Sequence, residues 1–449
     1  MNKFGMLASG LLVVAAHAFA QGPAVPPAPW RGAGPTPCVG ADGGIYSCPP
    51  APKTIAIKAG HLFDSRTGQV LANQVVVIQG DRIIDVGAAS SVKIPAGAET
   101  IDLSRAYVLP GLIDAHTHMF NTRNAKMTAE SSMLIAVQNV TADLRAGFTS
   151  ARDMSSHGNG YADVVMRDAI NQGRIDGPRY QVSTLGIVWS ANPPNPSSPD
   201  NPLASTVVRS VEDARAAVRE QISKGADWIK LFPGGAYSFS PAGDAQYVTT
   251  YPMPVLQALI DETHKLGKKT GCHVFGGVGL QQTIDAGCDT VEHAYGLTKA
   301  QAEQIAAKKL FYDPTLQRYI EPYMDDNDAK ATGGKFRMIP IFENAVRTAD
   351  HTPGVKIMMG SGADGATYAH GTQALDFEML VTRSGLSTVK AIQAGTIVNA
   401  EALGWLDKVG SIEKGKFADI IAVPGDPVAD ITQLKHVSFV MKGGKVIVK

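Results

Sequence analysis

The chain has 449 residues, too many for one simple sandwich, and this length suits either two domains or a large barrel with an accessory domain. Its 41 basic and 41 acidic residues balance, and no block of charge indicates binding to nucleic acid or to an acidic membrane surface. The 46 glycines and 27 prolines indicate many turns, as an α/β protein with long loops would have.

Residues 1–20 are expected to be a secretory signal peptide. Lys3 gives a positive start, residues 5–16 are mostly apolar, and Ala18-Phe19-Ala20 has the small residues of a cleavage site. The apolar core is too short to span a membrane, and no other stretch looks transmembrane. We therefore expect a periplasmic or secreted protein with no membrane span after signal cleavage. The alternative is an anchor that stays attached.

The four cysteines divide into two pairs. Cys38 and Cys48 lie in a Pro/Gly-rich extension, residues 21–52, which has little core of its own, so an exported protein is expected to join them by a disulfide. Cys272 and Cys288 lie in apolar, strand-like surroundings and are predicted to be buried free thiols. No spacing among the four cysteines resembles a zinc–thiolate site.

Short β runs mark both ends of the mature chain. The first group lies within residues 53–108, where a Gly80-Asp81 turn separates two of the runs, and the second group lies within residues 405–449. Neither group is large enough to be stable alone. We therefore predict one small β-sandwich domain assembled from both chain ends.

Residues 109–404 alternate between apolar, strand-like runs and helical stretches. This rhythm predicts an α/β fold of the (β/α)8 TIM-like barrel type. The alternative is an open doubly wound sheet, but no G-x-G-x-x-G follows the first strand to support it. The eight predicted strands are 112–116, 149–152, 180–187, 227–232, 269–274, 290–293, 311–314 and 356–360.

The first predicted strand ends in two histidines, His116 and His118. Alternate residues of a strand point to the same face, so the two imidazoles project together. They can bind one metal ion if other ligands arrive from elsewhere in the chain. The alternative is a half-buried strand with two hydrogen-bonded histidines.

Other predicted strands also carry metal-competent residues. Strand four contains Lys230, strands five and six end at His273 and His293, and strand eight runs into Asp364. In a (β/α)8 barrel the chemistry lies at the carboxyl ends of the strands, where these side chains would meet. Scattered structural histidines would not be expected to fall in this pattern.

These motifs, in this order, resemble the metal-dependent amidohydrolase superfamily. The resemblance covers the chain after about residue 53 and rests on P-G-L-I-D-A-H-T-H, the strand-four lysine, C-H-V-F-G-G-V-G, T-V-E-H-A and G-S-G-A-D-G-A. Within the superfamily the chain is similar to prolidase-like (Xaa-Pro-type) dipeptidases, N-acyl amino acid hydrolases and ochratoxin-cleaving amidases. The imidazolonepropionase-like members are also similar.

The resemblance implies two divalent metal ions, with zinc as the expected metal. His116, His118 and Asp364 would hold one ion, and His273 and His293 the other. Lys230, carboxylated on its side-chain nitrogen, would bridge the two ions together with a hydroxide. A free ammonium beside two dications is disfavoured, whereas the neutral amine can form an anionic carbamate. The alternative is a lysine that reaches solvent or pairs with Asp227.

The implied reaction is hydrolysis of an amide by the metal-bridging hydroxide. Asp364 would take the proton and pass it to the departing amine, although an Asx turn in a glycine-rich loop is the alternative reading of this residue. Tyr237 is the candidate donor to the developing oxyanion and a candidate substrate contact. A packing aromatic in a long loop is the alternative for Tyr237.

Three further residues are candidate substrate contacts. His157 and His370 follow strands two and eight on the predicted catalytic face, and Arg318 could pair with a substrate carboxylate. Each could equally be a surface residue. Residues 189–196 and 239–251 form insertions after strands three and four, and we expect them to shape a partly aromatic mouth.

We therefore expect a metal-dependent hydrolase acting on a dipeptide, an N-acyl amino acid or an ochratoxin-like aryl amide. A cyclic-amide hydrolase resembling imidazolonepropionase is the alternative enzyme, and a catalytically silent metal- or ligand-binding protein is the alternative outside enzymes. The expected partner is a small amide or dipeptide substrate and no nucleic acid. Resembling enzymes are commonly multimers, so a homo-oligomer is expected.

Overall fold

The computed structural model describes residues 37–39, 45–47, 53–121, 127–189, 203–319, 325–365 and 368–449. The predicted signal peptide lies outside the described residues. So does the predicted Cys38–Cys48 disulfide, because Cys48 and the side chain of Cys38 are not described. The two short strands in this part of the chain, β1 (Pro37–Val39) and β2 (Ile45–Ser47), pair antiparallel.

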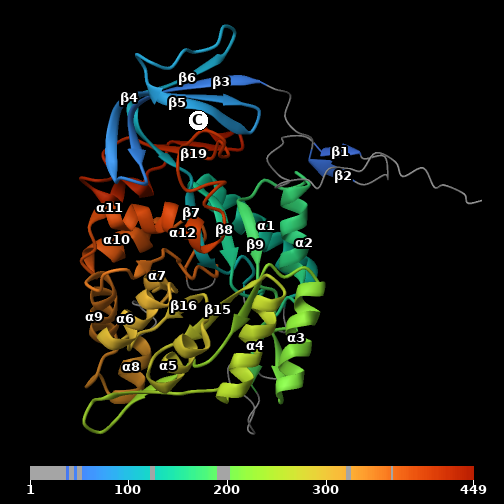
Figure 1. The fold of residues 1–449 in the computed structure, drawn as a ribbon, viewed down its shortest axis with the longest axis vertical. Coiled ribbons are helices and arrows are strands. Elements are labelled where there is room, and N and C mark those ends of the chain that lie inside the picture. The colour runs from blue at the N-terminus through green and yellow to red at the C-terminus, as the bar shows by residue number, and fades with distance from the viewer. Residues whose placement is uncertain are drawn as a thin grey trace, which may run out of the picture.

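The two ends of the chain meet in one seven-stranded sheet, at the top of Figure 1. Its strand order is β21-β20-β19-β6-β3-β4-β5, in which β3 and β6 are parallel and the other neighbours are antiparallel. The bounds are β3 (Thr54–Asp64), β4 (Gln69–Gln79), β5 (Arg82–Ala88), β6 (Glu99–Pro110), β19 (Ile420–Val423), β20 (Phe439–Lys442) and β21 (Lys445–Val448). Hydrogen bonds thus define a single mixed sheet with strands from both chain ends.

The chain between these two groups of strands contributes two parallel sheets. One has the order β7-β8-β9 and the other β11-β10-β12-β15-β16-β17-β18. The strands are β7 (Leu112–Thr117), β8 (Phe148–Asp153), β9 (Arg179–Val182), β10 (Gly186–Trp189), β11 (Ser205–Val208), β12 (Trp228–Leu231), β15 (Lys269–Val274), β16 (Thr290–His293), β17 (Phe311–Asp313) and β18 (Lys356–Ile357). The single run expected at 180–187 is therefore two strands, β9 and β10.

Backbone hydrogen bonds link the two parallel sheets at two places. Asp227 N donates to Val182 O at 2.8 Å, which joins the chain just before β12 to β9. At the other side, β7 bonds to the segment after β18, where Ala115 N donates to Met359 O at 3.1 Å and Gly362 N donates to His116 O at 2.6 Å. The first and eighth predicted strands therefore lie side by side.

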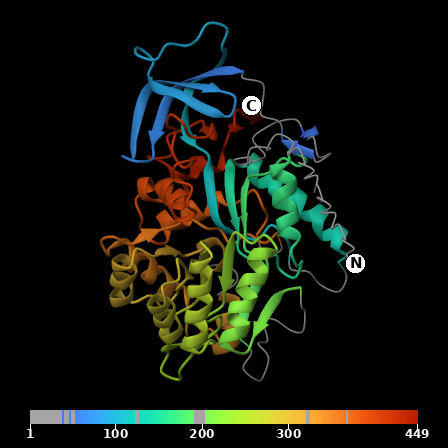
Figure 2. The same ribbon diagram turned by 45° about the vertical axis from the view of Figure 1, so that its right-hand side comes forward.

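Helices cover the outside of the parallel strands, as both views show (Figures 1 and 2). Their bounds are α1 (Ala129–Arg145), α2 (Ala162–Asn171), α3 (Val211–Ser223), α4 (Met253–Lys265), α5 (Gly277–Ala286), α6 (Lys299–Ala307), α7 (Leu316–Tyr319), α8 (Asp325–Thr332), α9 (Ile339–Asp350), α10 (Ala374–Thr382), α11 (Thr388–Gln393) and α12 (Asn399–Ala402), with a π-helix η2 (Ala394–Val398) and a 3-10 helix η3 (Ile431–Lys435). Local chemistry sets some of these boundaries. For example, Thr298 caps α6 in a capping box with Gln301.

A buried ion pair fastens the mixed sheet to the parallel strands. Arg179, at the start of β9, donates from Nε and Nη2 to the two carboxylate oxygens of Asp419, at 2.7 and 3.0 Å. The guanidinium also stacks on Phe417, 3.6 Å from the ring centre, and Arg82 lies 3.5 Å from the centre of the same ring. One aromatic ring thus contacts cations from both parts of the fold.

Cys272 and Cys288 are joined by a disulfide in the structure. The prediction that they are buried free thiols is therefore wrong. Their burial was expected correctly, since both are fully buried. Cys272 lies on β15 and Cys288 lies just before β16, and the parallel pairing of these neighbouring strands brings the two side chains together. The two cysteines are 16 positions apart in the sequence, so no local sequence pattern indicated that they pair.

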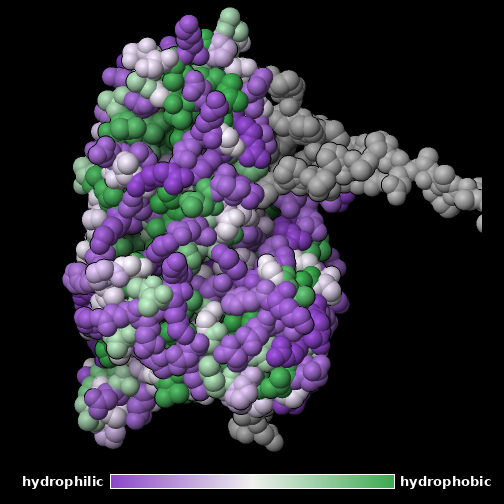
Figure 3. Space-filling view, in the orientation of Figure 1, coloured by the Kyte–Doolittle hydropathy of each residue, from purple (hydrophilic) through white to green (hydrophobic). Residues whose placement is uncertain are grey.

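Within the described residues, no helix is both long and apolar enough to cross a membrane. The face in Figure 3 is largely hydrophilic, with hydrophobic side chains gathered mainly over the mixed sheet. A small hairpin, β13 (Tyr237–Phe239) and β14 (Ala245–Tyr247), extends from the chain after β12. It belongs to one of the two insertions that were expected to shape the mouth.

Candidate metal centre and active site

Four histidine rings from three strands form a continuous cluster. The ring centres of His116 and His118 lie 5.3 Å apart, those of His116 and His293 5.1 Å, and those of His293 and His273 4.4 Å. His116, His118 and His293 are buried and His273 is half-buried. The structure therefore brings together all four histidines that were predicted to bind metal.

Strand geometry explains this convergence. His116 and His118 project from the same face at the end of β7, as alternation requires. His273 on β15 and His293 at the end of β16 come from neighbouring parallel strands, where the register places Val274 opposite His293. The carboxyl ends of parallel strands lie at the same end of the sheet, so residues far apart in sequence meet there.

The partners of three of these histidines fix which ring nitrogen faces the cluster. His118 Nδ1 lies 3.1 Å from the carbonyl oxygen of Ser155, which can only accept, so Nδ1 donates. His293 Nδ1 contacts Thr315 Oγ1, whose own proton goes to the Pro314 carbonyl at 2.6 Å. His116 Nδ1 lies 2.7 Å from a carboxylate oxygen of Glu292. In His116 and His118 the Nε2 lone pair is therefore the one left for a ligand, whereas Nε2 of His293 lies 2.9 Å from Nδ1 of His273 and accepts a hydrogen bond from it.

Glu292 connects His116 to a buried arginine. One Glu292 oxygen bonds to His116, and the other accepts from Arg152 Nη2 at 3.0 Å and from Thr290 Oγ1. Arg152 also donates from Nη1 to Thr290 Oγ1 at 3.0 Å, and its guanidinium lies 4.4 Å from the Trp228 ring centre. Both charged side chains are fully buried. This paired network holds the His116 ring in one orientation.

Lys230 is buried beside the histidines, with only 1% of its surface exposed. Burial lowers the pKa of Lys230 to about 8, with Glu292 opposing this shift and Arg152 adding to it. Burial, and next the charge of Lys230, lowers the pKa of His116 to about 3. Near neutral pH the His116 imidazole is therefore neutral, which is the form that binds metal, and part of the lysine is the free amine.

Asp364 reaches the cluster through the segment that follows β18. His118 N donates to Ala363 O at 2.8 Å, so the residue before Asp364 is paired directly with a cluster histidine. The Asp364 side chain is 2% exposed. Gly360, earlier in this segment, has no room for a side chain, because a Cβ there would lie 2.5 Å from His116 Cβ.

The predicted substrate residues lie at different depths. The His157 ring stacks on the His118 ring with centres 3.8 Å apart, so it borders the cluster. His370 is buried, with Nδ1 bonded to Asp143 at 2.9 Å and Nε2 to the His118 carbonyl at 3.2 Å. Tyr237 donates its hydroxyl to Asp328 at 2.9 Å. Arg318 lies in α7, and its side chain is outside the described part of the chain.

Sequence reasoning did not identify the roles of four buried residues that support the cluster, namely Arg152, Glu292, Asp313 and Thr315. Glu292 stands beside His293 in the T-V-E-H-A motif, and its position before a candidate ligand histidine was the available signal. His116, Glu292 and Asp313 also offer ligand atoms within 4.8 Å of one another. Because Glu292 already pairs with Arg152 and His116, we assign it to orienting the ring.

The donor set fits divalent metal ions. Neutral imidazoles and carboxylate oxygens are the ligands that zinc accepts in catalytic sites. Asp313 adds a buried oxygen, Oδ2, that accepts no hydrogen bond from the described residues. The other oxygen, Oδ1, accepts from Thr315 N at 3.2 Å. A buried carboxylate oxygen that lacks a partner is costly, so the place of Oδ2 beside the histidines favours a cation there.

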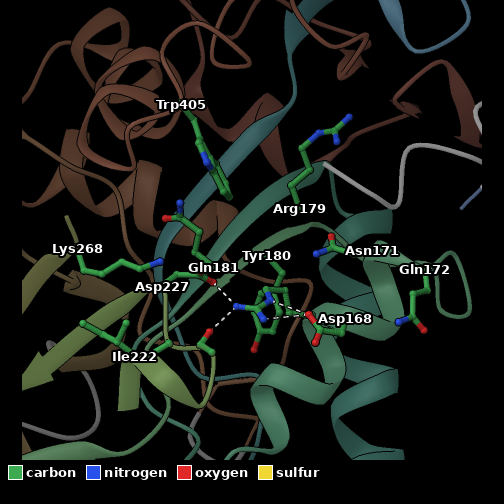
Figure 4. A pocket seen from close by; sticks show the side chains of 13 residues that line it. Asp168, Asn171, Gln172, Arg179, Tyr180, Gln181, Ile222, Asp227, Lys268 and Trp405 are labelled. Carbon is green, nitrogen blue, oxygen red and sulfur yellow. Dashed lines mark hydrogen bonds and ion pairs between the residues drawn. The ribbon is translucent and has the colours of Figure 1, made fainter. Parts of the chain in front are cut away.

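A cavity of about 590 Å³ lies elsewhere, where β9, β12 and β15 begin. Asp168, Gln181, Asp227, Lys268 and Trp405 are among the side chains around it (Figure 4). Arg167 is tied there to Asp227 at 2.8 Å and to Asp168 at 3.0 Å. This cavity is distant from the histidine cluster, because the cavity lies where the strands begin and the histidines lie at the carboxyl ends of the strands.

The sequence profile of the Amidohydrolase family matches residues 107–447. The chain belongs to the amidohydrolase family. Among its relatives is the ochratoxinase of Aspergillus niger, 27% identical over 436 residues, covering 88% of this chain and 86% of that protein.

Solved structures agree with this assignment. A Xaa-Pro dipeptidase with bound methionine has a TM-score of 0.76 at 28% identity, covering 88% of this chain and 99% of the other. A putative prolidase from Bifidobacterium longum has a TM-score of 0.75 at 27% identity, covering 88% and 95%. This amidohydrolase is therefore a hydrolase of carbon–nitrogen bonds, as the sequence indicated.

Proposed function

We propose that this amidohydrolase uses two divalent metal ions, with zinc as the expected metal, to cleave a linear amide. The substrate class is a dipeptide, an N-acyl amino acid or an aryl amide. The observation that carries the proposal is the convergence of His116, His118, His273 and His293 around the buried Lys230. When bound, such ions polarise a carbonyl group and lower the pKa of water.

The residues around the cluster then have separate tasks. His116, His118 and Asp364 would hold one ion, and His273 and His293 the other. Lys230, as its carbamate, would bridge the two, and a buried amine with a pKa near 8 supports this because its neutral form reacts with carbon dioxide. Asp364 would accept the proton of the attacking water and return it to the departing amine.

The fold supports the same proposal. The two parallel sheets would form one (β/α)8 barrel, supported by hydrogen bonds between β7 and the segment after β18 and between β9 and the start of β12. In that barrel the histidine cluster lies at the catalytic end. The names of two similar proteins also support a linear amide as the substrate, since one is an ochratoxinase and the other a Xaa-Pro dipeptidase.

We also propose that the protein acts after export. The apolar segment and small residues of positions 1–20 have the layout of a signal peptide. The Cys272–Cys288 disulfide supports an oxidising location, because such bonds are rare in reducing compartments.

The test is amino acid release by zinc-loaded protein from dipeptides, N-acyl amino acids and aryl-acyl phenylalanines. Release that disappears in Asp364→Asn supports amide hydrolysis and the role of Asp364. No release from any member would contradict the proposal for linear amides. Ring opening of a cyclic amide would then favour the imidazolonepropionase-like alternative, and metal binding without any turnover would favour a silent binding protein.

A further inference from the structure

A small cavity opens beside the histidine cluster. It measures about 240 Å³ and is lined by Gly235, Ala236, Tyr237, Ser238, Phe239, Phe275, Asp328 and Ala331. Two contacts place it next to the cluster. The Phe275 ring centre lies 4.8 Å from that of His273, and a Cβ on Gly235 would lie 3.3 Å from His273 Nε2.

Two neighbouring strands place an aromatic ring two residues after a cluster histidine. His273 is followed by Phe275, and His293 by Tyr295. The two rings stack with centres 4.1 Å apart and an interplanar angle of 16°. Phe275 is 5% exposed and Tyr295 is fully buried. An aromatic layer therefore continues outward from the histidine layer.

The β13–β14 hairpin supplies the facing wall. Tyr237 meets the rings of Phe275 and Tyr295 edge-on, with centres 6.1 Å away in both cases, and Phe239 meets Tyr237 edge-on at 5.9 Å. These are favourable geometries for aromatic pairs. At the other strand of the hairpin, Tyr247 fits over Gly276 and Gly296, where an added Cβ would lie 2.8 and 2.3 Å from its side chain. The two glycines let the hairpin pack closely.

Asp328 is the charged residue among the described lining residues. It is buried, and its oxygens accept from the Tyr237 hydroxyl at 2.9 Å and from the Met338 backbone N at 2.5 Å. No lysine or arginine belongs to this described lining. The wall therefore offers flat apolar surfaces and one anion, which would repel a second negative charge.

We propose that this aromatic pocket, lined by Tyr237, Phe239 and Phe275, selects amide substrates that carry an uncharged aromatic ring. The inference rests on the proposed amide hydrolysis and specifies its substrate. The volume is sufficient, because an apolar cavity of about 150 Å³ already binds benzene. A ring held here lies beside His273, so its amide is close to the histidine cluster. A ring bearing a carboxylate is disfavoured by Asp328.

Two matched substrate pairs test the pocket with zinc-loaded enzyme. N-acetylphenylalanine against N-acetylalanine places the ring on the amine side, and N-phenylacetylglycine against N-acetylglycine places it on the acyl side. We expect kcat/KM to favour the aromatic member at least about tenfold in one pair, which also names the side. A 4-carboxyphenyl analogue should lose most of that preference.

Variants of Phe239 test whether the pocket determines the aromatic preference independently of amide hydrolysis itself. Phe239→Ala should reduce the aromatic preference about tenfold, because kcat/KM should fall much more for the aromatic member of a pair than for its small counterpart. Phe239→Leu keeps apolar volume and should give a smaller loss. Val248→Ala is the control, because Val248 is 51% exposed and outside the lining.

The possible failures are distinct. Cleavage of both members of each pair at similar rates, or a preference that Phe239→Ala leaves intact, would overturn the pocket assignment and leave amide hydrolysis standing. Cleavage of no member of either pair, together with none of the wider amide panel, would overturn the proposed function and this assignment with it.

Discussion

The Nδ1 atom of His116 lies 2.7 Å from Oε2 of Glu292, and both side chains are buried. The contact selects one tautomer of the imidazole and presents Nε2 to the cluster. Arg152 neutralises Glu292 from the other side, so the carboxylate is paired although it is removed from solvent. The orientation of the His116 ring thus depends on the buried Glu292–Arg152 ion pair.

Glu292→Gln should weaken metal retention. The amide cannot accept from His116 and pair with Arg152 as a carboxylate does, and loss of such a partner costs about 10–100-fold in metal affinity. The measurement is metal content after dialysis against graded chelator, by elemental analysis. Glu262→Gln is the control, since Glu262 is also buried and paired with Arg215 and Arg219 but lies on α4. Equal metal retention in both variants would contradict the orienting role.

Lys230→Met should abolish activity and reduce the metal content. If the carbamate forms, metal-free wild-type protein reloaded with zinc in carbon-dioxide-free buffer should regain less activity than with added bicarbonate. The variant should not respond to bicarbonate. Lys442→Met is a matched control, because Lys442 is a buried lysine that donates to the Gly177 carbonyl away from the cluster. Full bicarbonate-independent reactivation of wild-type protein would rule out the carbamate.

Removal of the Cys272–Cys288 disulfide should lower stability. The bond closes a loop of 16 residues of sequence separation, and a loop of about that length contributes roughly 3 kcal/mol by restricting the unfolded chain. The double variant Cys272→Ala, Cys288→Ala should therefore show a lower free energy of unfolding in denaturant titrations. Thiol titration of unfolded, unreduced wild-type protein provides the direct check: reactive thiols from both positions would show that the bond is absent.

His264 gives the stability a defined pH dependence. Its hydrogen bond to Asp289, 2.8 Å long, raises the pKa of His264 above its usual value of about 6.5. The stabilisation is fully present below that usual pKa and is lost as pH rises through the raised folded value. Wild-type stability should therefore fall relative to His264→Gln as pH rises from the usual pKa of about 6.5 through the raised folded value. The effect should be small because the ring is 41% exposed. The measurement is the free energy of unfolding against pH for both proteins, and parallel curves would contradict a role of His264 in the pH dependence.

The elements that could be predicted from sequence were those governed by local rules. Alternation along a strand predicted that His116 and His118 point together. The apolar runs located the parallel strands within a few residues, except that β9 and β10 were predicted as one strand and β11 was not predicted. Helices lie between the parallel strands as the alternation predicted, for example α1 between β7 and β8. Because His273 and His293 end two other predicted strands, they were expected to meet the first two histidines at the carboxyl ends of the strands.

Features governed by pairing between distant segments were missed. Glu292 contacts His116 across 176 residues of sequence, and nothing in T-V-E-H-A alone names that partner. The thiols were predicted free because each lies in an apolar run, whereas their pairing depends on the register of β15 and β16. The hydrogen bond of the Tyr237 hydroxyl was also missed, because its partner Asp328 lies 91 residues away in the sequence.

The mixed sheet has a consequence for biosynthesis. Its central strand β6 pairs with β3 on one side and with β19 on the other, and β19 is followed by the last two strands of the chain. While the protein is being made, β6 therefore has an open edge until β19 has been synthesised, roughly 300 residues later in the sequence. The sheet can form fully only after β19 and the strands that follow it have been made, so the nascent chain must avoid edge-to-edge association until then.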